Sequence, residues 1–490
     1  MNSDYGLIVT QTAGTMKRIS YFLVFFFTCY FSAFSQDKGY SIKLTIKGLR
    51  DSTCYLSHYF GYTQHLVKDT AKLDASGVLL FEGKQPLPEG LYFVTLPQKR
   101  KVEFIWIASE PIFSIASDTL DFISNAQVEG SQENIDYFAY LKYVKIQTDQ
   151  MESMQAFGGG PKDNNPMVQQ RLRTLRNELY SYLNRLATEY GNRLVGKYIK
   201  AVAEPRLPMP PRYANGGYDT AFVSRAVRQH FFDNIDFSDE RMVRSPFLQR
   251  RLDTYFDRVA IPQIDSLKTA CDRIVALASA NKEVLRYTVW SMSNLFETAK
   301  IIGTDAIFVH IAEEYYLKGK VETDSSVLKN LAERVKTLKP LLIGQPMPPL
   351  ILTDPNNKIH SLQNLSTDLT FVVFYDPLCQ KCRAKMPKLI DFYKKHKAES
   401  VSLFAVMVER NEGLWKNMLN EFKIKDLWIN VWDKTGKINY KKDFDIYGTP
   451  VIYVLNKEKK IILKRLEVDQ LDAVMELYKR NKLAVASTKK

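Results

Sequence analysis

Two cysteines separated by two residues are the side chains of this sequence best placed to do chemistry. Cys379 and Cys382 follow a continuous apolar run, Leu369 to Tyr375, which is typical of a strand buried on both faces. Asp376 and Pro377 end the run, because this dipeptide favours a turn, and a helical pattern then begins at the cysteines. A strand, a sharp break and a Cys-X-X-Cys at the start of a helix indicate a thiol–disulfide couple.

The position of each cysteine indicates its role in thiol–disulfide exchange. At the exposed N-terminus of a helix, free N–H groups and the helix dipole favour the thiolate. Cys379 is therefore the expected nucleophile, and Cys382, one turn further along, is the expected resolving thiol. Lys381 and Arg383 add positive charge beside the pair, so we expect them to help stabilise the thiolate.

Zinc binding is the main alternative use of such a pair. Structural zinc needs four ligands, and the nearest histidine, His396, is expected at the far end of the same helix. Other possible ligand groups are Asp233, Asp236, Asp239 and Glu240, and His310, Glu313 and Glu314. Neither group has the spacing of a calcium loop or a di-metal helix motif, so we expect a solvated turn with Ser238 as a helix cap, and an ordinary histidine. No metal or other cofactor is expected.

The start of the chain has the pattern of a secretory signal peptide. Lys17 and Arg18 precede an apolar run over 19–34, and small residues follow at the cleavage positions. Residues 1–35 are therefore predicted to be a signal peptide, with Met16 as the natural initiator. Because the run is near the lower length limit of a membrane span, an uncleaved N-terminal anchor is the alternative. In both cases we expect an exported protein of the periplasm or cell envelope.

Changes in pattern divide the rest of the chain into three predicted domains. Short alternating runs between glycines and prolines predict an antiparallel β-sandwich or barrel over 36–130. A helical period predicts an all-α domain over 131–340, and alternating strands and helices predict an α/β domain over 341–485. A chain of 490 residues is long enough for about three domains. The predicted fold class is therefore multidomain α+β.

The composition is that of a basic globular protein. Lys and Arg number 68 against 54 Asp and Glu, which gives a net charge of +14. A nucleic-acid surface needs clustered basic residues with interleaved aromatics, whereas here they are scattered, so no nucleic-acid partner is expected. Cys54 and Cys271 lie in apolar strand and helix patterns and are expected to be buried thiols rather than disulfide partners.

The last predicted domain carries four features in a recognisable order. They are a strand ending in Phe374-Tyr375, the motif Cys379-Gln380-Lys381-Cys382, Pro387 in the following helix, and Gly448-Thr449-Pro450 ahead of a later strand. Over residues 342–482 this order resembles the thioredoxin superfamily, specifically its exported TlpA/ResA-like branch of thiol–disulfide oxidoreductases. The resemblance implies a helix kinked at Pro387 and a cis bond before Pro450. It also implies that Thr449 and Pro450 face the cysteines and hold the substrate main chain.

The same resemblance implies an enzyme that reduces or isomerises disulfides in thiol or disulfide proteins of the cell envelope. A membrane or periplasmic electron donor would recharge it. Residues before 341 resemble the accessory regions that precede such modules in exported proteins of Bacteroidota-type bacteria.

Two positions depart from the family pattern. Leu378 stands where a tryptophan is common, and Lys385 stands where many relatives have a proton-handling glutamate. Asp376 is a candidate to take over proton transfer, or equally to cap the helix. Lys385 is expected to stabilise the thiolate and make the protein a stronger oxidant than thioredoxin, whose potential is about −270 mV.

Two other classes of protein compete with this interpretation. One is a binding or scaffold protein whose thioredoxin fold does not turn over and whose function resides in residues 36–340. The other is a thiol peroxidase, because peroxiredoxins share the fold. A peroxidatic cysteine lies in a Pro-X-X-X-Thr-X-X-Cys setting, and the residues before Cys379 lack that threonine.

Overall fold

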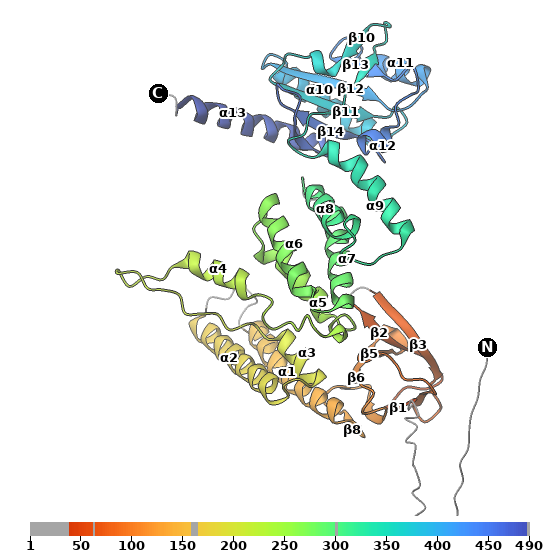
Figure 1. Cartoon of the computed structure of the whole chain (residues 1–490), viewed down its shortest axis with the longest axis vertical. Helices are drawn as coiled ribbons and strands as arrows, with labels where there is room; N and C mark the ends of the chain where they lie inside the picture. Colours follow the sequence, from red (N-terminus) through yellow and green to blue (C-terminus); the bar gives the residue numbers. More distant parts are fainter. Residues whose placement is uncertain (1–38, 62–63, 158–164, 299–301, 488–490) are drawn as a thin grey trace, which may run out of the picture.

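The structure, a computed structural model, describes residues 39–61, 64–157, 165–298 and 302–487. Figure 1 shows three regions along the long axis: a β-sandwich, a helical region and an α/β domain. The predicted multidomain α+β class is confirmed. The signal peptide predicted over 1–35, and the alternative anchor, lie outside the described residues. Within the described ranges, no helix is both long and apolar enough to cross a membrane.

The N-terminal region is a sandwich of two four-stranded sheets. The first contains, in order across the sheet, β4 (Val78–Gly83), β1 (Tyr40–Lys47), β7 (Ile112–Asp118) and β8 (Gln127–Glu129). The second contains β3 (Gln64–Lys72), β2 (Thr53–Phe60), β5 (Gly90–Thr95) and β6 (Lys101–Trp106). Neighbouring strands run antiparallel, as predicted, except that β1 and β7 are parallel.

Strand β5 contributes to two different cores. Tyr92 and Val94 are buried between the two sheets, whereas their neighbours Leu91 and Phe93 are buried against the helices. Successive side chains of a strand point to opposite faces, so apolar residues at every position mean that both faces of the sheet are covered. The sandwich and the helical region therefore share a core across the predicted boundary at residue 130.

The helical region contains nine α-helices among the described residues. They are α1 (Gln132–Phe157), α2 (Pro166–Glu189), α3 (Leu194–Val202), α4 (Thr220–His230), α5 (Phe247–Thr254), α6 (Ile264–Ala278), α7 (Lys282–Thr298), α8 (Asp305–Ile311) and α9 (Ser325–Leu338). Helix α1 is attached to β6 by buried Asn134, whose side chain bonds both the N–H and the C=O of Ile105, at 2.8 and 2.7 Å. The Asn134 side-chain amide thus bonds the backbone of Ile105 in the way that a neighbouring strand would.

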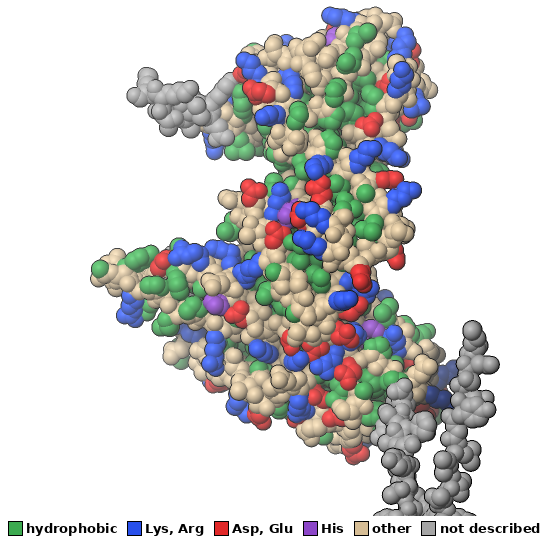
Figure 2. All heavy atoms as spheres, in the orientation of Figure 1, with side chains coloured by type: hydrophobic (Ala, Val, Ile, Leu, Met, Phe, Trp, Pro, Cys, Tyr) green, Lys and Arg blue, Asp and Glu red, His purple; other side chains and the backbone are tan. Residues whose placement is uncertain are grey.

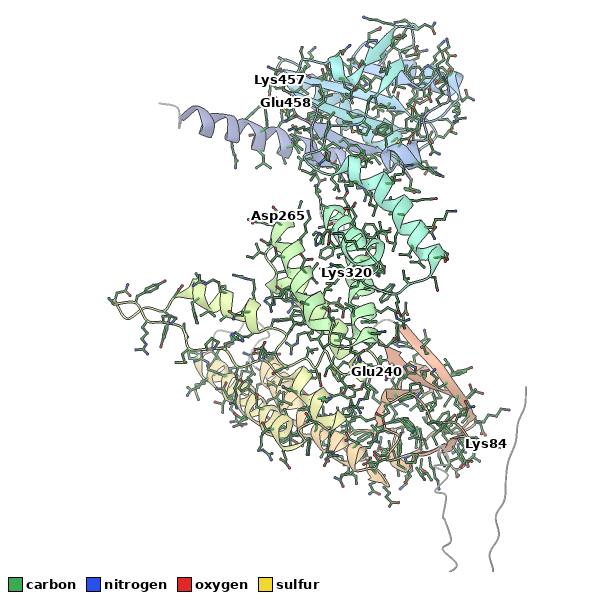
Figure 3. The ribbon with its side chains drawn as sticks, in the orientation of Figure 1. Lys84, Glu240, Asp265, Lys320, Lys457 and Glu458 are labelled. Carbon is green, nitrogen blue, oxygen red and sulfur yellow. The ribbon has the colours of Figure 1, made fainter. Side chains whose placement is uncertain are left out.

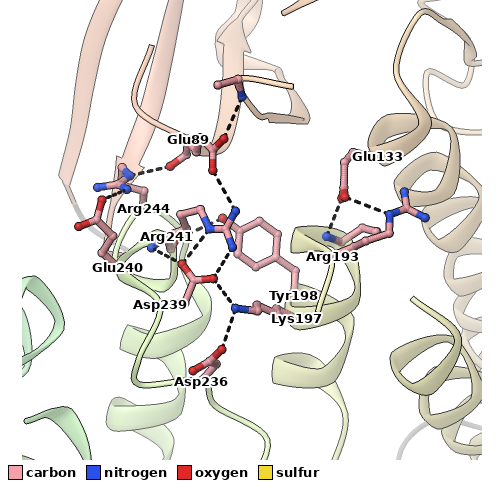
Figure 4. A network of polar contacts seen from close by, with 12 residues as sticks. Glu89, Glu133, Arg193, Lys197, Tyr198, Asp236, Asp239, Glu240, Arg241 and Arg244 are labelled. Atoms are coloured by element: carbon pink, nitrogen blue, oxygen red, sulfur yellow. Dashed lines mark hydrogen bonds and ion pairs between the residues drawn. The ribbon is translucent and has the colours of Figure 1, made fainter. Parts of the chain in front are cut away.

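Charged side chains also join the sandwich to the helices (Figure 4). Glu89, just before β5, accepts a hydrogen bond from Arg241 at 2.9 Å. Arg241 also donates to Asp239 at 2.6 Å, and Asp239 lies 2.7 Å from the Lys197 ammonium group of α3. Asp239 is buried, and its pKa is lowered: burial alone would raise it, but hydrogen bonds from Arg241 and Lys197 outweigh that cost.

In both groups of possible metal ligands, the side chains form hydrogen bonds or ion pairs with other side chains of this chain. The prediction that Ser238 caps the next turn in a solvated loop is wrong, because Asp239 is the cap and accepts from the Arg241 N–H at 3.0 Å. His310 Nε2 lies 2.6 Å from the Asp272 carboxylate. Over the described part of the chain, no group of three or more His, Cys, Asp or Glu side chains could hold a metal ion.

The C-terminal domain is built on a seven-stranded sheet. Its strands, in order across the sheet, are β10 (Ile359–Ser361), β9 (Ile351–Thr353), β13 (Ile429–Trp432), β12 (Val401–Met407), β11 (Leu369–Tyr375), β14 (Val451–Leu455) and β15 (Ile461–Lys464). Its helices are α10 (Gln380–His396), α11 (Glu412–Glu421), α12 (Tyr440–Phe444) and α13 (Leu471–Ser487). The central strand β11 is parallel to β12, antiparallel to β14 and buried at every position, as the apolar run predicts.

The two faces of this sheet have separate cores. Phe371 and Val373 pack with α10, α11 and α13 on one face, whereas Val372 and Phe374 pack with α12 and the chain that enters the domain on the other. Figure 3 shows Lys457 and Glu458, in the turn between β14 and β15, at the edge of this domain. On the face seen in Figure 2, basic and acidic side chains are both spread over all three regions.

Candidate active site

The turn after β11 places the first cysteine at the start of α10. Cys379 is the N-cap of the helix, and its sulfur accepts a hydrogen bond from the Cys382 N–H at 3.2 Å. Just before it, the Asp376 carboxylate accepts from the Leu378 N–H at 2.7 Å. Asp376 therefore stabilises the turn that leads into the helix, while the cap of α10 itself is the cysteine sulfur. A proton-transfer role for Asp376 stays a prediction.

Helix α10 carries the second cysteine into the core. It runs without a break from Gln380 to His396, with Pro387 inside it. Cys382 is buried among the side chains that pack on β11, whereas Cys379 is partly exposed. Both are free thiols, as are buried Cys54 and Cys271. An incoming disulfide can therefore reach Cys379 before it reaches Cys382.

The loop between α12 and β14 lies against the first cysteine. The Thr449–Pro450 peptide bond is cis, as the resemblance implies. The Thr449 carbonyl accepts a hydrogen bond from the Cys379 thiol at 3.2 Å, across a separation of 70 residues in the chain. The fold thus brings four of the predicted site residues together: the two cysteines, Thr449 and Pro450. That the loop holds substrate main chain stays a prediction.

The two thiols have pKa values displaced in opposite directions. Burial raises the pKa of Cys382 to about 12, helped by its hydrogen bond with Cys379. Partial burial also acts to raise the pKa of Cys379, but hydrogen bonds to its sulfur from Cys382, from the Thr449 side chain and from backbone N–H groups outweigh it. The pKa of Cys379 is therefore below its ordinary value, so the partly exposed sulfur loses its proton at a lower pH than the buried one.

The basic residues beside the pair have acidic partners. Lys381 lies 2.8 Å from Glu467, and Arg383 is held by both oxygens of Glu421 at 2.5 and 2.7 Å. The hydrogen bond to Glu467, before any attraction to the two sulfurs, is the main cause of the raised pKa of Lys381.

Lys385 is likewise paired, with Asp469, which also binds Lys388 at 2.7 Å. The positive charge that the sequence predicts around Cys379 is thus largely balanced by neighbouring carboxylates. Thiolate tuning by Lys381, Arg383 and Lys385 stays a prediction, with a smaller expected size than the sequence alone indicates.

Sequence reasoning missed these three carboxylates because each lies far along the chain from its partner. Lys381 and Glu467 are 86 residues apart, and Lys385 and Asp469 are 84 residues apart. A signal was present in the pattern of charge. Basic residues recur on one face of α10, and acidic residues recur at the start of the last helical segment, over 467–472.

Two exposed apolar side chains lie close in the chain to Cys379 and to Thr449. Leu378, where the family commonly has tryptophan, is 61% exposed, and Tyr447, two residues before Thr449, is 68% exposed. Isolated exposed apolar residues are ordinary. Beside a partly exposed thiol, however, they provide a surface that a polypeptide with a disulfide can contact. The arrangement can therefore perform exchange between a protein disulfide and the Cys379–Cys382 pair.

Comparison with known proteins agrees with this geometry. A family model described as "Thioredoxin-like" matches residues 367–461. Residues 40–137 and 221–337 match two models of domains of unknown function, DUF4369 and DUF5106. A thiol-disulfide oxidoreductase ResA from Bacillus thuringiensis subsp. konkukian is 24% identical over 136 residues, which are 28% of this chain and 76% of the relative.

Two solved structures are also similar to this chain. A domain of a possible thiol-disulfide isomerase from Cytophaga hutchinsonii is 34% identical, and the match covers 30% of this chain and 98% of the domain, with a TM-score of 0.28. A thioredoxin-like protein from Bacteroides caccae is 18% identical, with coverage of 56% of this chain and 99% of its own, and a TM-score of 0.46.

Fold and site together define a thioredoxin-like domain with a dithiol at a helix N-terminus. Residues 367–461 are thioredoxin-like, and the C-terminal domain that contains them is similar in sequence to thiol-disulfide oxidoreductases.

Proposed function

We propose that this protein is an exported enzyme of the cell envelope that uses Cys379 and Cys382 to reduce or isomerise disulfides in other proteins. The observation that carries the proposal is the contrast between the two thiols. Cys379 is partly exposed and has a lowered pKa, while Cys382 is buried one turn away and has a raised pKa. A nucleophile needs access and ionisation, whereas a resolving thiol must stay protonated until the mixed disulfide forms.

The reaction follows from these positions. The Cys379 thiolate attacks one sulfur of a substrate disulfide, so that a mixed disulfide forms and the other substrate sulfur leaves as a thiolate. Cys382 then loses its proton and attacks the Cys379 sulfur, which releases the second substrate thiol. The pair ends as a disulfide, and two electrons have passed to the substrate. A dithiol electron donor of the membrane or periplasm returns the pair to its reduced form.

Isomerisation uses the same first step. If the released substrate thiolate attacks a different disulfide of its own chain before Cys382 acts, a new substrate thiolate is set free. That thiolate attacks the substrate sulfur of the mixed disulfide, so a rearranged substrate disulfide forms, Cys379 leaves as a thiolate and the enzyme pair is again reduced. Leu378 and Tyr447 would contact apolar segments next to the attacked disulfide, and Thr449 and Pro450 would lie along the substrate main chain.

Trapping tests the proposal. In Cys382→Ser the mixed disulfide cannot be resolved, so envelope proteins should stay attached to Cys379 and appear as reducible adducts on non-reducing gels. Cys379→Ser is the matched control and should yield none, since buried Cys382 cannot reach a substrate. A chain that traps nothing in the Cys382→Ser form would be a binding or scaffold protein.

A further inference from the structure

The loop that contacts Cys379 begins at an unusual residue. Asp445 ends α12 in the left-handed region, with φ 56° and ψ 38°. Its side chain is only 2% exposed. Among residues other than glycine, Asp and Asn tolerate this conformation best. From Asp445 the chain needs only four more residues to reach Thr449, whose carbonyl accepts from the Cys379 thiol. The position of Asp445 therefore sets where the loop starts.

Two arginines hold the Asp445 carboxylate, one from each side of the domain boundary. Arg334 of α9 donates to one carboxylate oxygen and Arg465, which follows β15, donates to the other. Arg334 also lies 3.4 Å from Glu297 of α7, and its guanidinium group is 5.9 Å from the centre of the Tyr447 ring. One side chain of the helical region thus contacts the loop at two points, Asp445 and Tyr447.

Arg465, the second arginine, also connects Asp445 to the cysteine pair. Two residues after Arg465, Glu467 pairs with Lys381, which lies between the two cysteines. The Asp445 carboxylate is therefore connected both to the loop with Thr449 and to the segment that faces the Cys-X-X-Cys turn. A buried carboxylate that loses one of its partners is left undercompensated, and the loop around it is then free to shift.

We propose that Arg334 is a positioning residue for the redox site: through Asp445 and Tyr447 it attaches the helical region to the loop and holds Thr449 against the two thiols. This inference rests on the proposed role of Cys379 as the nucleophile. The helical region then contributes to the redox site, because it fixes the position of the Thr449 loop in the thioredoxin-like domain.

The pH profile of Cys379 alkylation in the full-length protein tests the proposal, with iodoacetamide as the probe. Arg334→Met should let Thr449 move away, so that its side chain no longer hydrogen-bonds the Cys379 sulfur, an interaction that lowers the pKa of Cys379. Alkylation at pH 7 should then slow by about three- to tenfold, the size expected for one such hydrogen bond, and the midpoint should move to higher pH. Lys381 and Cys382, the titratable groups that interact with Cys379, are unchanged in this variant. A purely structural role for Arg334 would leave the midpoint where it is.

Controls separate the possible outcomes. Lys339→Met removes a cation of the same connecting segment, paired at 2.7 Å with Glu313 inside the helical region, and should leave the profile unchanged. If Arg334→Met does not fold, Asp445→Asn, which keeps the side-chain shape, decides instead and should shift the profile in the same direction. A wild-type profile in the folded variant overturns the inference. If Cys382→Ser traps no substrate, the proposed function fails, whatever Arg334 does.

Discussion

The helical region has two junctions, and they are built differently. Against the sandwich, it shares a continuous apolar core in which Leu91 and Phe93 of β5 pack among the helices. Against the thioredoxin-like domain, buried charges dominate. Lys464 pairs with Asp305 of α8 and donates to the Leu341 carbonyl at 2.7 Å, and Arg334 pairs with Asp445. Beside this second junction lies a cleft of about 690 Å³, lined by α9, α12 and Tyr447.

The two junctions have different physical roles. Apolar burial is non-directional and scales with area, so the first junction makes the sandwich and the helices one folding unit. Buried ion pairs contribute little net stability, but they have specific geometry. The second junction therefore sets the orientation of the thioredoxin-like domain and of its active-site loop. We therefore expect the sandwich and the helices to behave as one body that carries the thioredoxin-like domain.

The largest effect is expected from damage to the first junction. Leu91 is 0% exposed, so Leu91→Ala should lower the free energy of unfolding by about 2–5 kcal/mol, the usual cost of a buried Leu→Ala change. Hydrogen exchange should show lost protection in the sandwich and the helical region together. Leu120→Ala, at a residue 91% exposed, is the matched control and should change nothing measurable. Loss of protection in the sandwich alone would mean that the two regions are separate units.

Damage to the second junction should cost less. Asp305→Asn removes the charged partner of Lys464, and we expect a loss of about 1.5–3 kcal/mol, the range for hydrogen bonds to charged groups. A double-mutant cycle with Lys464→Met, followed by urea unfolding of the thioredoxin-like domain, isolates the pair. Additive effects of the two changes would show that this ion pair does not join the regions.

A smaller effect is expected next to the cysteines. Thr449→Val keeps the shape of the side chain but removes the hydroxyl that hydrogen-bonds the Cys379 sulfur. The pKa of Cys379 should rise, and its alkylation at pH 7 should slow by about three- to tenfold. Thr435→Val, at a hydroxyl bonded to Asp433 in a distant turn, is the control. Equal alkylation rates in wild type and Thr449→Val would show that the Thr449 hydroxyl does not lower the pKa of Cys379.

The smallest effect is expected from the basic flank. Because Lys385 is paired with Asp469, Lys385→Gln should change the reduction potential by less than about 30 mV, which corresponds to about 1.4 kcal/mol for a two-electron couple. Equilibration with glutathione measures this. A larger fall in the potential would support the prediction that Lys385 makes the protein a stronger oxidant than thioredoxin.

Features of the fold and site that arise from neighbouring residues can be predicted from the sequence, whereas contacts between distant residues cannot. The buried strand, the cysteine motif and the Thr-Pro dipeptide are local patterns, and they were enough to predict the fold class and to select the residues that the fold brings together. The partners of charged groups are not local. Arg334 and Asp445 are 111 residues apart, and only the packed structure shows that they meet.

The shared core was equally hidden from the sequence analysis, although β5 carries a hint of it. Apolar residues at successive positions, from Leu91 to Val94, indicate a strand covered on both faces. The prediction of a separate sandwich took only the short strands and the turns between them into account. What lies on the second face, a layer of helices, is a tertiary feature that no local pattern contains.

Alkylation resolved by residue and by pH tests whether Cys379 is the nucleophile and Cys382 the resolving thiol. Native reduced protein is treated with iodoacetamide between pH 5 and 10, and labelling of each cysteine is followed by mass spectrometry. Cys379 should be labelled with a midpoint below that of an ordinary cysteine, while Cys382, Cys54 and Cys271 should react only after unfolding. Equal labelling of Cys379 and Cys382, or faster labelling of Cys382, would contradict the assignment of nucleophile and resolving thiol.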